Sequence, residues 1–581
     1  MFTKQSQTKY RLLSLGVALI LALFAACGQG GSGATTTAAA AETTTAAATT
    51  AAQAETTAAA ETTAEATTAA AAEASTAAAE TTAAATTAAE TTTEAAVAAD
   101  DMPFVEFSWY VGLTPLPDNQ MVNDAVNEYI LPLLNAKVNI YYWPTKDWEE
   151  KMTIMVSSGD DLGIIGFGTQ SKLDYVIQSR LGSFYPLDDL LPGYGAGTYS
   201  LFPKEIWESI KINGHIYGIP SLKDNCYIIS LIYNEDMANE LGIDMSQANY
   251  KSFATIEPFY NTVIEKRDEV YGDLEEPLAG GIGLETPYWF AVETFLQDSN
   301  MAVCNIDGIM DIAGYDSNTV FNLYATQEYR DTCKSVQRMV DKNILAYDYE
   351  GKSAWNSTGN MFGWPGWGYT YMPEHLYSDN FTTKMIEPVR VWTDTNNYVS
   401  AGTAISANAK NPERLMMFLE MVNNDPFLAT MMRFGIEGQH YIRDADGKML
   451  FEGSPRNSDN ANPGYRYWYA APLGNLLIVE APVSYSGPEG IMLTKMKEFN
   501  DNAKLPSHMG FIYDIDPVGN EIAACTSVVL EYRDMLRNGR LSSEAEVDAV
   551  VDEFNQKLEA NGVGVVIADV QRQIDEWNAS R

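Results

Sequence analysis

The stretch 213–234, NGHIYGIPSLKDNCYIISLIYN, most constrains how this chain of 581 residues can fold. Its first dipeptide, Asn213-Gly214, predicts a tight turn, and the short apolar run after it ends at Pro220, where a strand should stop. The eight residues Cys226–Tyr233 are almost all β-branched or aromatic, which predicts a strand buried on both faces of a sheet. The polar residues between the two strands are therefore expected in a loop at the rim of a sheet.

Strands and helices alternate in the residues that precede this stretch. Strands are expected at Phe104–Tyr110, Val138–Trp143 and Leu162–Phe167, with helices at Asn119–Leu134 and Lys146–Ser158 between them. This spacing predicts right-handed βαβ units in a parallel sheet. In such sheets ligands bind in loops at the carboxyl ends of the strands.

Local signals also predict the structure of several later segments. We expect helices over Pro203–Ile212, from Glu235 onward, and after Asn411, which should be an N-cap with Pro412 in the first turn. The Asp446-Gly447 dipeptide predicts a hairpin turn. The aromatic residues of 361–371 (MFGWPGWGYTY) are interrupted by glycine and predict an irregular loop.

Composition divides the chain into three regions. Residues 1–27 form a leader, residues 28–101 consist almost entirely of Ala, Thr and Glu, and only the remaining 480 or so residues, here called the body, have a globular composition. Residues 28–101 cannot bury enough apolar surface to offset the entropy of ordering, so we expect a disordered tether with a root-mean-square reach of roughly 45 to 50 Å.

The body is strongly acidic. The net charge of the chain is −40; three positive charges lie in the leader and ten negative charges in residues 28–101, which leaves about −33 for the body. Binding to nucleic acid requires clusters of Lys and Arg that contact phosphates. The charge therefore argues against a nucleic-acid partner, and it favours an exported protein that stays soluble.

Several segments together resemble a known family. The GxxYGIPS pattern with the apolar strand that ends in YN, the SGDD step at residues 158–161, GSFYPLDDLL at 182–191, and the helix NPERLMMFLEMVNNDP resemble bacterial extracellular solute-binding proteins that deliver sugars to ABC importers. Residues 510–581 resemble the C-terminal region of the LipO/LplA-like lipoproteins of this family. The resemblance covers roughly residues 102–581.

The resemblance implies an α/β fold of the type II periplasmic-binding-protein class. Each of two lobes would be a mostly parallel sheet flanked by helices, and crossover strands would join the lobes. On this basis we expect lobe 1 to begin with 102–225, lobe 2 with its hinge crossover to occupy 226–400, and 401–581 to return to lobe 1 and form a C-terminal helical region.

The leader has the features of a lipoprotein signal peptide. Lys4, Lys9 and Arg11 precede an apolar run of about fifteen residues, which is too short for a membrane span. Ala25-Ala26-Cys27 resembles the lipobox, although Phe24 stands where the pattern prefers Leu. The resemblance implies that Cys27 is lipidated and that a monomeric protein is held on the extracellular face of the membrane by its lipid alone.

Sugar sites combine aromatic faces with planar polar side chains. The resemblance implies a mono- or oligosaccharide ligand, ABC permease subunits as partners, and a second-lobe Trp that stacks on the sugar. The candidate ligand contacts, each of which has packing in a core as its alternative role, are Trp109, Trp143, Phe167, Asp224, Asn225, Trp289, Trp364, Trp367, Tyr371 and Arg390.

The sequence does not predict a cofactor or a metal site. Histidine is scarce and no HxH or HExxH spacing occurs, and His440 is expected to be a hydrogen-bonded structural residue. Residues 444–447 lack the full spacing of a calcium loop. For Cys226, Cys304, Cys333 and Cys525, buried free thiols and disulfides both remain open.

Two other functions remain open at this stage. A secreted polysaccharide-active enzyme would also need an aromatic cleft and could use Asp224 and Glu285 as general acid and base, but the sequence has no recognisable catalytic motif. A transport protein for peptides or amino acids would keep the same fold and change the ligand.

Overall fold

The computed structural model describes residues 102–581 except 169–172, 229, 249–252, 272–289, 297–298, 310–311, 313, 343, 346–361, 367–381, 387–390, 460–461, 469 and 483–489. Within these ranges the buried apolar residues form separate cores. The first core combines residues 105–219 with residues 398–473. The second core combines residues 290–333 with the C-terminal helices, and the third core consists of residues from 237–392. Segments far apart in the sequence therefore build each core.

The first core surrounds a five-stranded sheet with the strand order β2-β1-β3-β12-β4. The strands β1 and β2 are parallel, as are β1 and β3, whereas β12 runs antiparallel to both β3 and β4. The predicted parallel βαβ unit is confirmed. The bounds are β1 (Val105–Val111), β2 (Ala136–Tyr142), β3 (Ile164–Gly168), β4 (Ile219–Pro220) and β12 (Ala401–Ile405).

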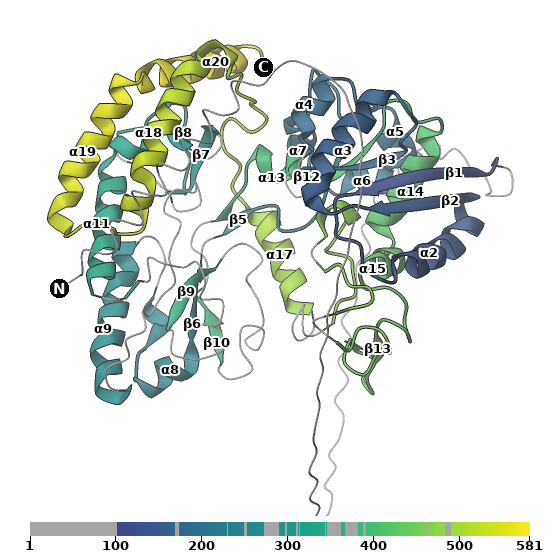
Figure 1. The fold of residues 1–581 in the computed structure, drawn as a ribbon, viewed down its shortest axis with the longest axis horizontal. Helices are drawn as coiled ribbons and strands as arrows, with labels where there is room; N and C mark the ends of the chain where they lie inside the picture. The colour runs from purple at the N-terminus through teal and green to yellow at the C-terminus, as the bar shows by residue number, and fades with distance from the viewer. Residues whose placement is uncertain are drawn as a thin grey trace, which may run out of the picture. The chain divides into compact units, whose positions relative to one another are not determined.

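Helices cover this sheet, as Figure 1 shows. The predicted helix Asn119–Leu134 is confirmed as α2, and α14 begins at Pro412 with Asn411 as its N-cap, although the Asn411 side chain makes no capping hydrogen bond. The bounds of α14 are Pro412–Asn424, and the other helices of this part are α3 (Thr145–Ser158), α4 (Tyr175–Arg180), α5 (Leu190–Tyr194), α6 (Ala196–Ser200), α7 (Lys204–Ser209), α13 (Thr395–Val399) and α15 (Pro426–Phe434). Met492 and Met496 of α17 (Ile491–Asn502) belong to a separate cluster.

The predicted turn at Asn213-Gly214 is confirmed. Both residues have positive φ angles, 52° and 85°, and the backbone N–H groups and carbonyls of Ile212 and His215 bond across the turn. This hairpin leads into β4, the edge strand of the sheet. Pro220 has no backbone N–H to donate, and at an edge no further strand requires one. A second predicted hairpin is also confirmed, with β13 (Ile442–Arg443) paired to β14 (Met449–Leu450).

The second and third cores share helix α11 (Gln327–Asp341), whose Cys333 lies in the second core and whose Val336 lies in the third. The antiparallel pair β7 (Val292–Leu296) and β8 (Ser299–Asn305) belongs to the second core. The third core includes α8 (Glu235–Glu240) and α9 (Phe253–Tyr271). The helix predicted from Glu235 is thus confirmed, and the Asn234 side chain caps it.

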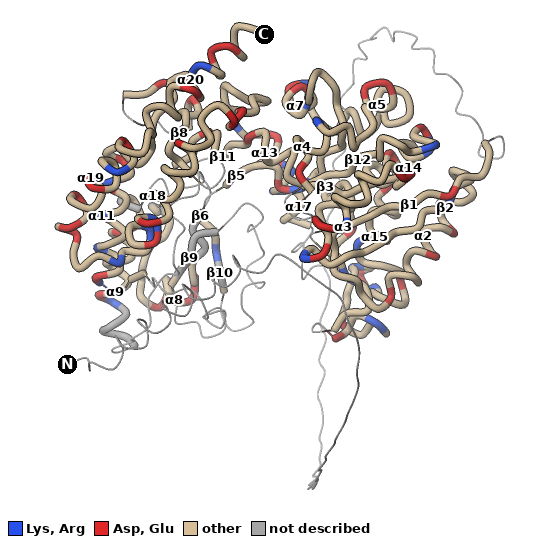
Figure 2. Tube along the Cα trace, turned by 45° about the horizontal axis from the view of Figure 1, so that its top comes forward, with Lys and Arg blue, Asp and Glu red and all other residues tan. Residues whose placement is uncertain are grey.

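The C-terminal helices pack on the second core rather than on the first. Apolar residues of α18 (Gly519–Arg537), α19 (Glu544–Ala560) and α20 (Val563–Ala579) join the residues of β8 and α11 in one cluster. The Arg330 guanidinium on α11 bonds the carboxylates of Asp548 and Asp552 on α19. Figure 2 shows that Asp and Glu residues are spread along these helices and along those of the first core.

Two strand predictions need correction. The run Cys226–Tyr233 is not one strand: β5 (Tyr227–Ile228) pairs with β11 (Val391–Trp392), whereas β6 (Ser230–Asn234) lies in a different sheet between β9 and β10 (Thr383–Met385). The described part of 361–371 is not irregular, because β9 (Gly363–Gly366) pairs antiparallel with β6. Backbone pairing to a neighbouring strand overrides the glycines here.

Candidate functional site

Three segments connect the first core with the second and third cores; we call them crossing segments. The first, 221–226, follows β4; the second, 393–400, lies between β11 and β12; the third, 503–510, follows α17. Since β4 runs in the same direction as β1, β2 and β3, the first crossing segment leaves from the carboxyl ends of these strands. We call this side of the sheet the carboxyl edge.

Hydrogen bonds tie the crossing segments together. The Asn500 side chain accepts the backbone N–H of Asn225 at 2.8 Å and donates to the carbonyl of Lys223 at 2.5 Å. The Thr393 hydroxyl donates to the carbonyl of Asn225 at 2.6 Å, and the Thr393 N–H donates to the carbonyl of Lys504 at 2.9 Å. All three segments therefore share one hydrogen-bond network, and we call the crossing segments with this network the hinge.

An aromatic group lies at the carboxyl ends of β1 and β2. Tyr110 stacks on Tyr141 with ring centroids 4.9 Å apart, and it meets Trp143 edge to face at 5.7 Å. Trp143 packs against Trp148 of α3, and the Lys151 ammonium lies 5.2 Å from the centroid of the Trp143 ring. Tyr141 is 42% exposed and Trp143 is half-buried, so this group offers aromatic surface beside a cation.

The structure separates the candidates of the first core by exposure. Trp143 lies at the carboxyl edge as expected. Trp109 lies within β1 and is completely buried against Phe418 of α14. Phe167 lies within β3 and is buried against Tyr175. Burial gives Trp109 and Phe167 the role of core packing in this structure, and their contact with a ligand stays an untested prediction.

Asp224 and Asn225 lie on the first crossing segment, and both are buried. Asn225 uses its side chain within the hinge: the amide donates to the carbonyls of Ser221 and Asn397 and accepts from the N–H of Lys223. The Lys223 ammonium lies 3.3 Å from the Asp224 carboxylate, whose pKa burial raises above its ordinary value. The contact of Asp224 and Asn225 with a ligand stays an untested prediction.

The remaining candidates are not tested by the structure. Trp289, Trp367, Tyr371 and Arg390 lie outside the described residues, as does Cys27. For Trp364 only the backbone is described, as part of β9 opposite Ile232 of β6.

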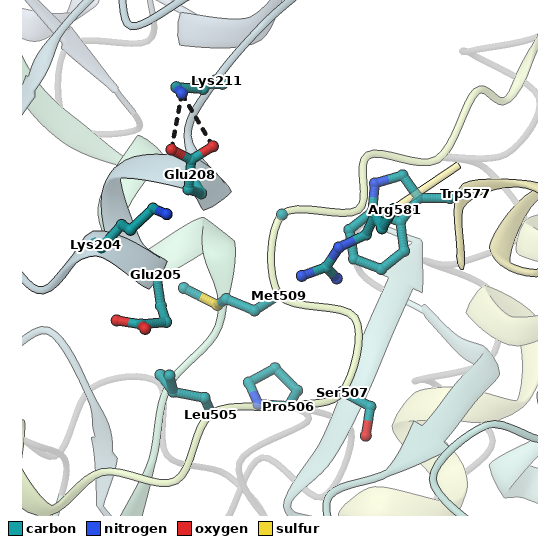
Figure 3. A pocket seen from close by; sticks show the side chains of 11 residues that line it. Lys204, Glu205, Glu208, Lys211, Leu505, Pro506, Ser507, Met509, Trp577 and Arg581 are labelled. Atoms are coloured by element: carbon teal, nitrogen blue, oxygen red, sulfur yellow. Dashed lines mark hydrogen bonds and ion pairs between the residues drawn. The ribbon is translucent and has the colours of Figure 1, made fainter. Parts of the chain in front are cut away.

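A cavity of about 530 Å³ lies beside the third crossing segment and shares no residue with the aromatic group. Figure 3 shows Lys204 and Arg581 on opposite sides of Met509 in this cavity, with the Lys211 ammonium bonded to Glu208. It combines residues of α7, the third crossing segment and the end of the chain: Lys204, Glu205, Glu208, Lys211, Leu505, Pro506, Ser507, Met509, Gly510, Trp577 and Arg581.

Buried titratable side chains gather at the hinge. Nδ1 of His508 lies 2.8 Å from Oε2 of Glu293 on β7, and both side chains are buried. The Asp394 carboxylate on the second crossing segment accepts the Tyr227 hydroxyl at 3.1 Å. Burial raises the pKa of Glu293, and it raises the pKa of Asp394 to about 6.

The predicted structural role of His440 is confirmed, because its Nδ1 accepts the backbone N–H of Ile436 at 3.0 Å. The Asp444 carboxylate accepts the N–H groups of Asp446 and Lys448, so it closes the hairpin turn. Within the described ranges, no three His, Cys, Asp or Glu side chains are grouped to hold a metal ion. Cys226, Cys304, Cys333 and Cys525 are buried free thiols.

Sequence reasoning missed several residues of this region. Tyr110 and Tyr141 lie within the predicted strands, and alternation along β1 could have placed Tyr110 on the face opposite Trp109. Asn500 and His508 carried no local signal, because their partners Asn225 and Glu293 lie 275 and 215 residues away in the sequence.

Comparison with known proteins shows relatives across most of the chain. A family model described as a domain of unknown function (DUF3502) matches residues 507–579. A carbohydrate ABC transporter substrate-binding protein of Streptococcus pneumoniae serotype 4 is 23% identical over 500 residues, which cover 84% of this chain and 93% of that protein.

Solved structures are similar over the same extent. The N-glycan transport solute binding protein NgtS of Streptococcus pneumoniae matches with a TM-score of 0.66 and 20% identity, covering 82% of this chain and 99% of NgtS. Its complex with Man1GlcNAc matches with a TM-score of 0.58 and 20% identity, covering 81% and 99%. An extracellular solute-binding protein of Bifidobacterium longum subsp. infantis matches with a TM-score of 0.50 and 14% identity, covering 81% and 97%.

These likenesses confirm the predicted resemblance to extracellular solute-binding proteins and the type II α/β fold. They also agree with the structure, in which separate cores are joined by crossing segments. None of the described helices is both long enough and apolar enough to cross a membrane.

Proposed function

We propose that this chain is the substrate-binding protein of a carbohydrate ABC importer. It binds an oligosaccharide between its lobes and presents the closed form to permease subunits outside the cell. The observation that carries the proposal is the hinge: three crossing segments, tied by Asn225, Asn500 and Thr393, join separately packed cores at the carboxyl edge of a sheet. The likeness to a carbohydrate importer's binding protein over 500 residues supports it.

The aromatic group of Tyr110, Tyr141 and Trp143 is the lobe 1 part of the proposed sugar site. Aromatic faces bind the C–H surfaces of sugar rings, and a neighbouring ammonium such as that of Lys151 can donate to sugar hydroxyls. The candidates Trp289, Trp364, Trp367, Tyr371 and Arg390 are proposed as the lobe 2 part.

The domain limits and the lipid anchor remain part of the proposal. The expected limits place 102–225 and 401–581 in lobe 1 and 226–400 in lobe 2. We propose instead that the C-terminal helices belong to lobe 2 and that lobe 1 keeps 102–225 and most of 401–500, because these helices share the second core. The body would be a monomer held to the membrane by a lipid on Cys27 and by the tether 28–101.

The enzyme alternative has less support. Asp224, its proposed acid or base, lies against the Lys223 ammonium, and its proposed partner Glu285 lies outside the described residues. The relatives are transport proteins. Both points favour binding without catalysis.

A thermal-shift panel tests the class of ligand. Man1GlcNAc, Man5GlcNAc, other neutral oligosaccharides, peptides and divalent metal ions would each be added to the protein. A ligand at a hundred times its dissociation constant raises the free energy of unfolding by about 2.7 kcal/mol. An oligosaccharide should raise the melting temperature; a rise with peptides or metals alone would contradict the sugar assignment.

A further inference from the structure

Three titratable side chains at the hinge belong to different segments. Glu293 is on β7 of the second core, His508 is on the third crossing segment, and Asp394 is on the second. Glu293 and His508 are in contact, with 2.8 Å between Oε2 and Nδ1, and their side chains are 7% and 0% exposed. We call these three residues the hinge cluster.

Side chains and backbone groups of the neighbouring elements surround the hinge cluster. From β8 the Cys304 thiol faces Glu293, and from β5 the Tyr227 hydroxyl donates to Asp394. The N–H of Asn397 also donates to Asp394, at 3.0 Å. On the other side, His508 meets the rings of Phe295 and Trp577, and the Arg581 guanidinium covers Trp577 at 4.2 Å.

Nε2 of His508 is buried without a hydrogen-bond partner among the described residues. The polar atoms of the hinge cluster are therefore incompletely satisfied in this arrangement, so a change in the surrounding segments can change their interactions. Burial raises the pKa of both Glu293 and Asp394, and the negative charge of Glu293 adds to the increase for Asp394.

We propose that the hinge cluster couples proton binding to the rotation of the lobes. The proposal rests on the proposed function, since it assumes that the chain opens and closes at the crossing segments. Rotation changes the backbone of these segments, so it changes the separations among Glu293, His508 and Asp394. The proton affinity of the cluster therefore differs between the open and closed forms, and by linkage pH shifts the balance between them.

The test measures the distance between the lobes in the full chain without ligand. Fluorescent dyes on L133C in α2 and L530C in α18, both exposed positions, report this distance by energy transfer in a C27S background. Between pH 5 and pH 7.5 we expect the ratio of open to closed molecules to change by about threefold or more. In E293Q and D394N the change should be lost or sharply reduced.

His440 provides a matched control, because it is another fully buried histidine next to a carboxylate, 3.4 Å from Asp118, but lies away from the crossing segments. H440Q should keep the pH profile of the unmodified chain. A flat profile in the unmodified chain, or an unchanged profile in both E293Q and D394N, would overturn the proposal.

Failure of this proposal can be distinguished from failure of the proposed function. Titration with Man1GlcNAc and Man5GlcNAc at a single pH reports binding independently of the pH profile. Circular dichroism identifies a variant that does not fold. If E293Q or D394N does not fold, the pH profile of the other variant decides the outcome.

Discussion

Asn500, near the end of α17, holds the first crossing segment in place: the Asn225 backbone N–H donates to Oδ1 of Asn500 at 2.8 Å, although the residues are 275 positions apart in the sequence. The same Asn500 amide donates to the carbonyl of Lys223. The end of α17 is thereby fixed to the segment that leaves β4. These bonds would keep the segments together during the proposed lobe rotation.

Replacing Asn500 should therefore destabilise the protein. N500A removes both bonds and leaves a buried N–H of Asn225 without its partner, which should lower the free energy of unfolding by about 1 to 3 kcal/mol. Asn502 on the same helix is exposed, and its side chain donates to the carbonyl of Glu498 on that helix, so N502A should change the free energy of unfolding by less than about 0.5 kcal/mol. Urea unfolding measures the free energy of unfolding of N500A and N502A. Equal decreases in the two variants would contradict a role for Asn500 in holding the crossing segment.

Trp143 should contribute directly to sugar binding. W143A removes the aromatic surface at the carboxyl edge and should weaken oligosaccharide affinity about tenfold, which corresponds to about 1.4 kcal/mol. F104A is the control, because Phe104 is a 52% exposed aromatic residue just before β1, at the opposite edge of the same sheet. Calorimetric titration should show that F104A binds the oligosaccharide as tightly as the unmodified protein does. If W143A also bound it as tightly as the unmodified protein, the sugar site would not include Trp143.

Stability should depend on Asp394 in mildly acidic solution. Burial raises its pKa from 3.8 to about 6, so between these values the folded state binds a proton that the unfolded state lacks. The contribution of Asp394 to the free energy of unfolding therefore falls as pH rises from about 4 to about 6, by at most about 3 kcal/mol.

D394N should remove this dependence. Urea unfolding at about pH 4, 5, 6 and 7 measures the difference in free energy between D394N and the unmodified chain. As pH rises from about 4 to about 6, D394N should become more stable relative to the unmodified chain. A difference that stays constant would show that Asp394 does not titrate as its burial indicates.

The four thiols of the body should be unreactive in the folded protein. Burial raises the pKa of Cys226 to about 12 and that of Cys525 to about 11, and it raises the pKa of Cys304 as well. Since the thiolate is the reactive form, a thiol reagent at pH 8 should modify all four only after denaturation. Rapid reaction in the native state would show that this part of the structure opens.

Cys27 should be required for attachment to the membrane. C27S removes the residue that would carry the lipid, so the protein should lose radioactive palmitate labelling and appear in the culture medium or remain as precursor. Membrane fractionation checks the location. Palmitate labelling that persists in C27S would place the lipid on another residue.

Local signals in the sequence were sufficient for most elements of the first core. The bounds of α2 match the prediction, because apolar periodicity and the residues at its ends are local properties. The turn at Asn213-Gly214 and the hairpin at Asp446-Gly447 were likewise determined by their own residues. The family resemblance added the two-lobed arrangement, which composition and spacing alone do not give.

Partners distant in the sequence decide what could not be predicted. An apolar run such as Cys226–Tyr233 indicates burial but not which strand it pairs with, so its division between two sheets was missed. The strand at Gly363–Gly366 exists because β6 lies beside it. The candidate site has the same limitation: residue type made Trp109 and Trp143 equal candidates, and only the packing of Phe418 on one of them separates the two.

Calorimetric titration of oligosaccharides into the protein, followed by chromatography of the recovered sugar, tests the proposed function most directly. The account predicts saturable binding of one oligosaccharide per chain and recovery of that sugar intact. Cleavage of the sugar would establish the enzyme alternative instead, and absence of binding by any oligosaccharide in the panel, with binding of peptides, would contradict the assignment to carbohydrate import.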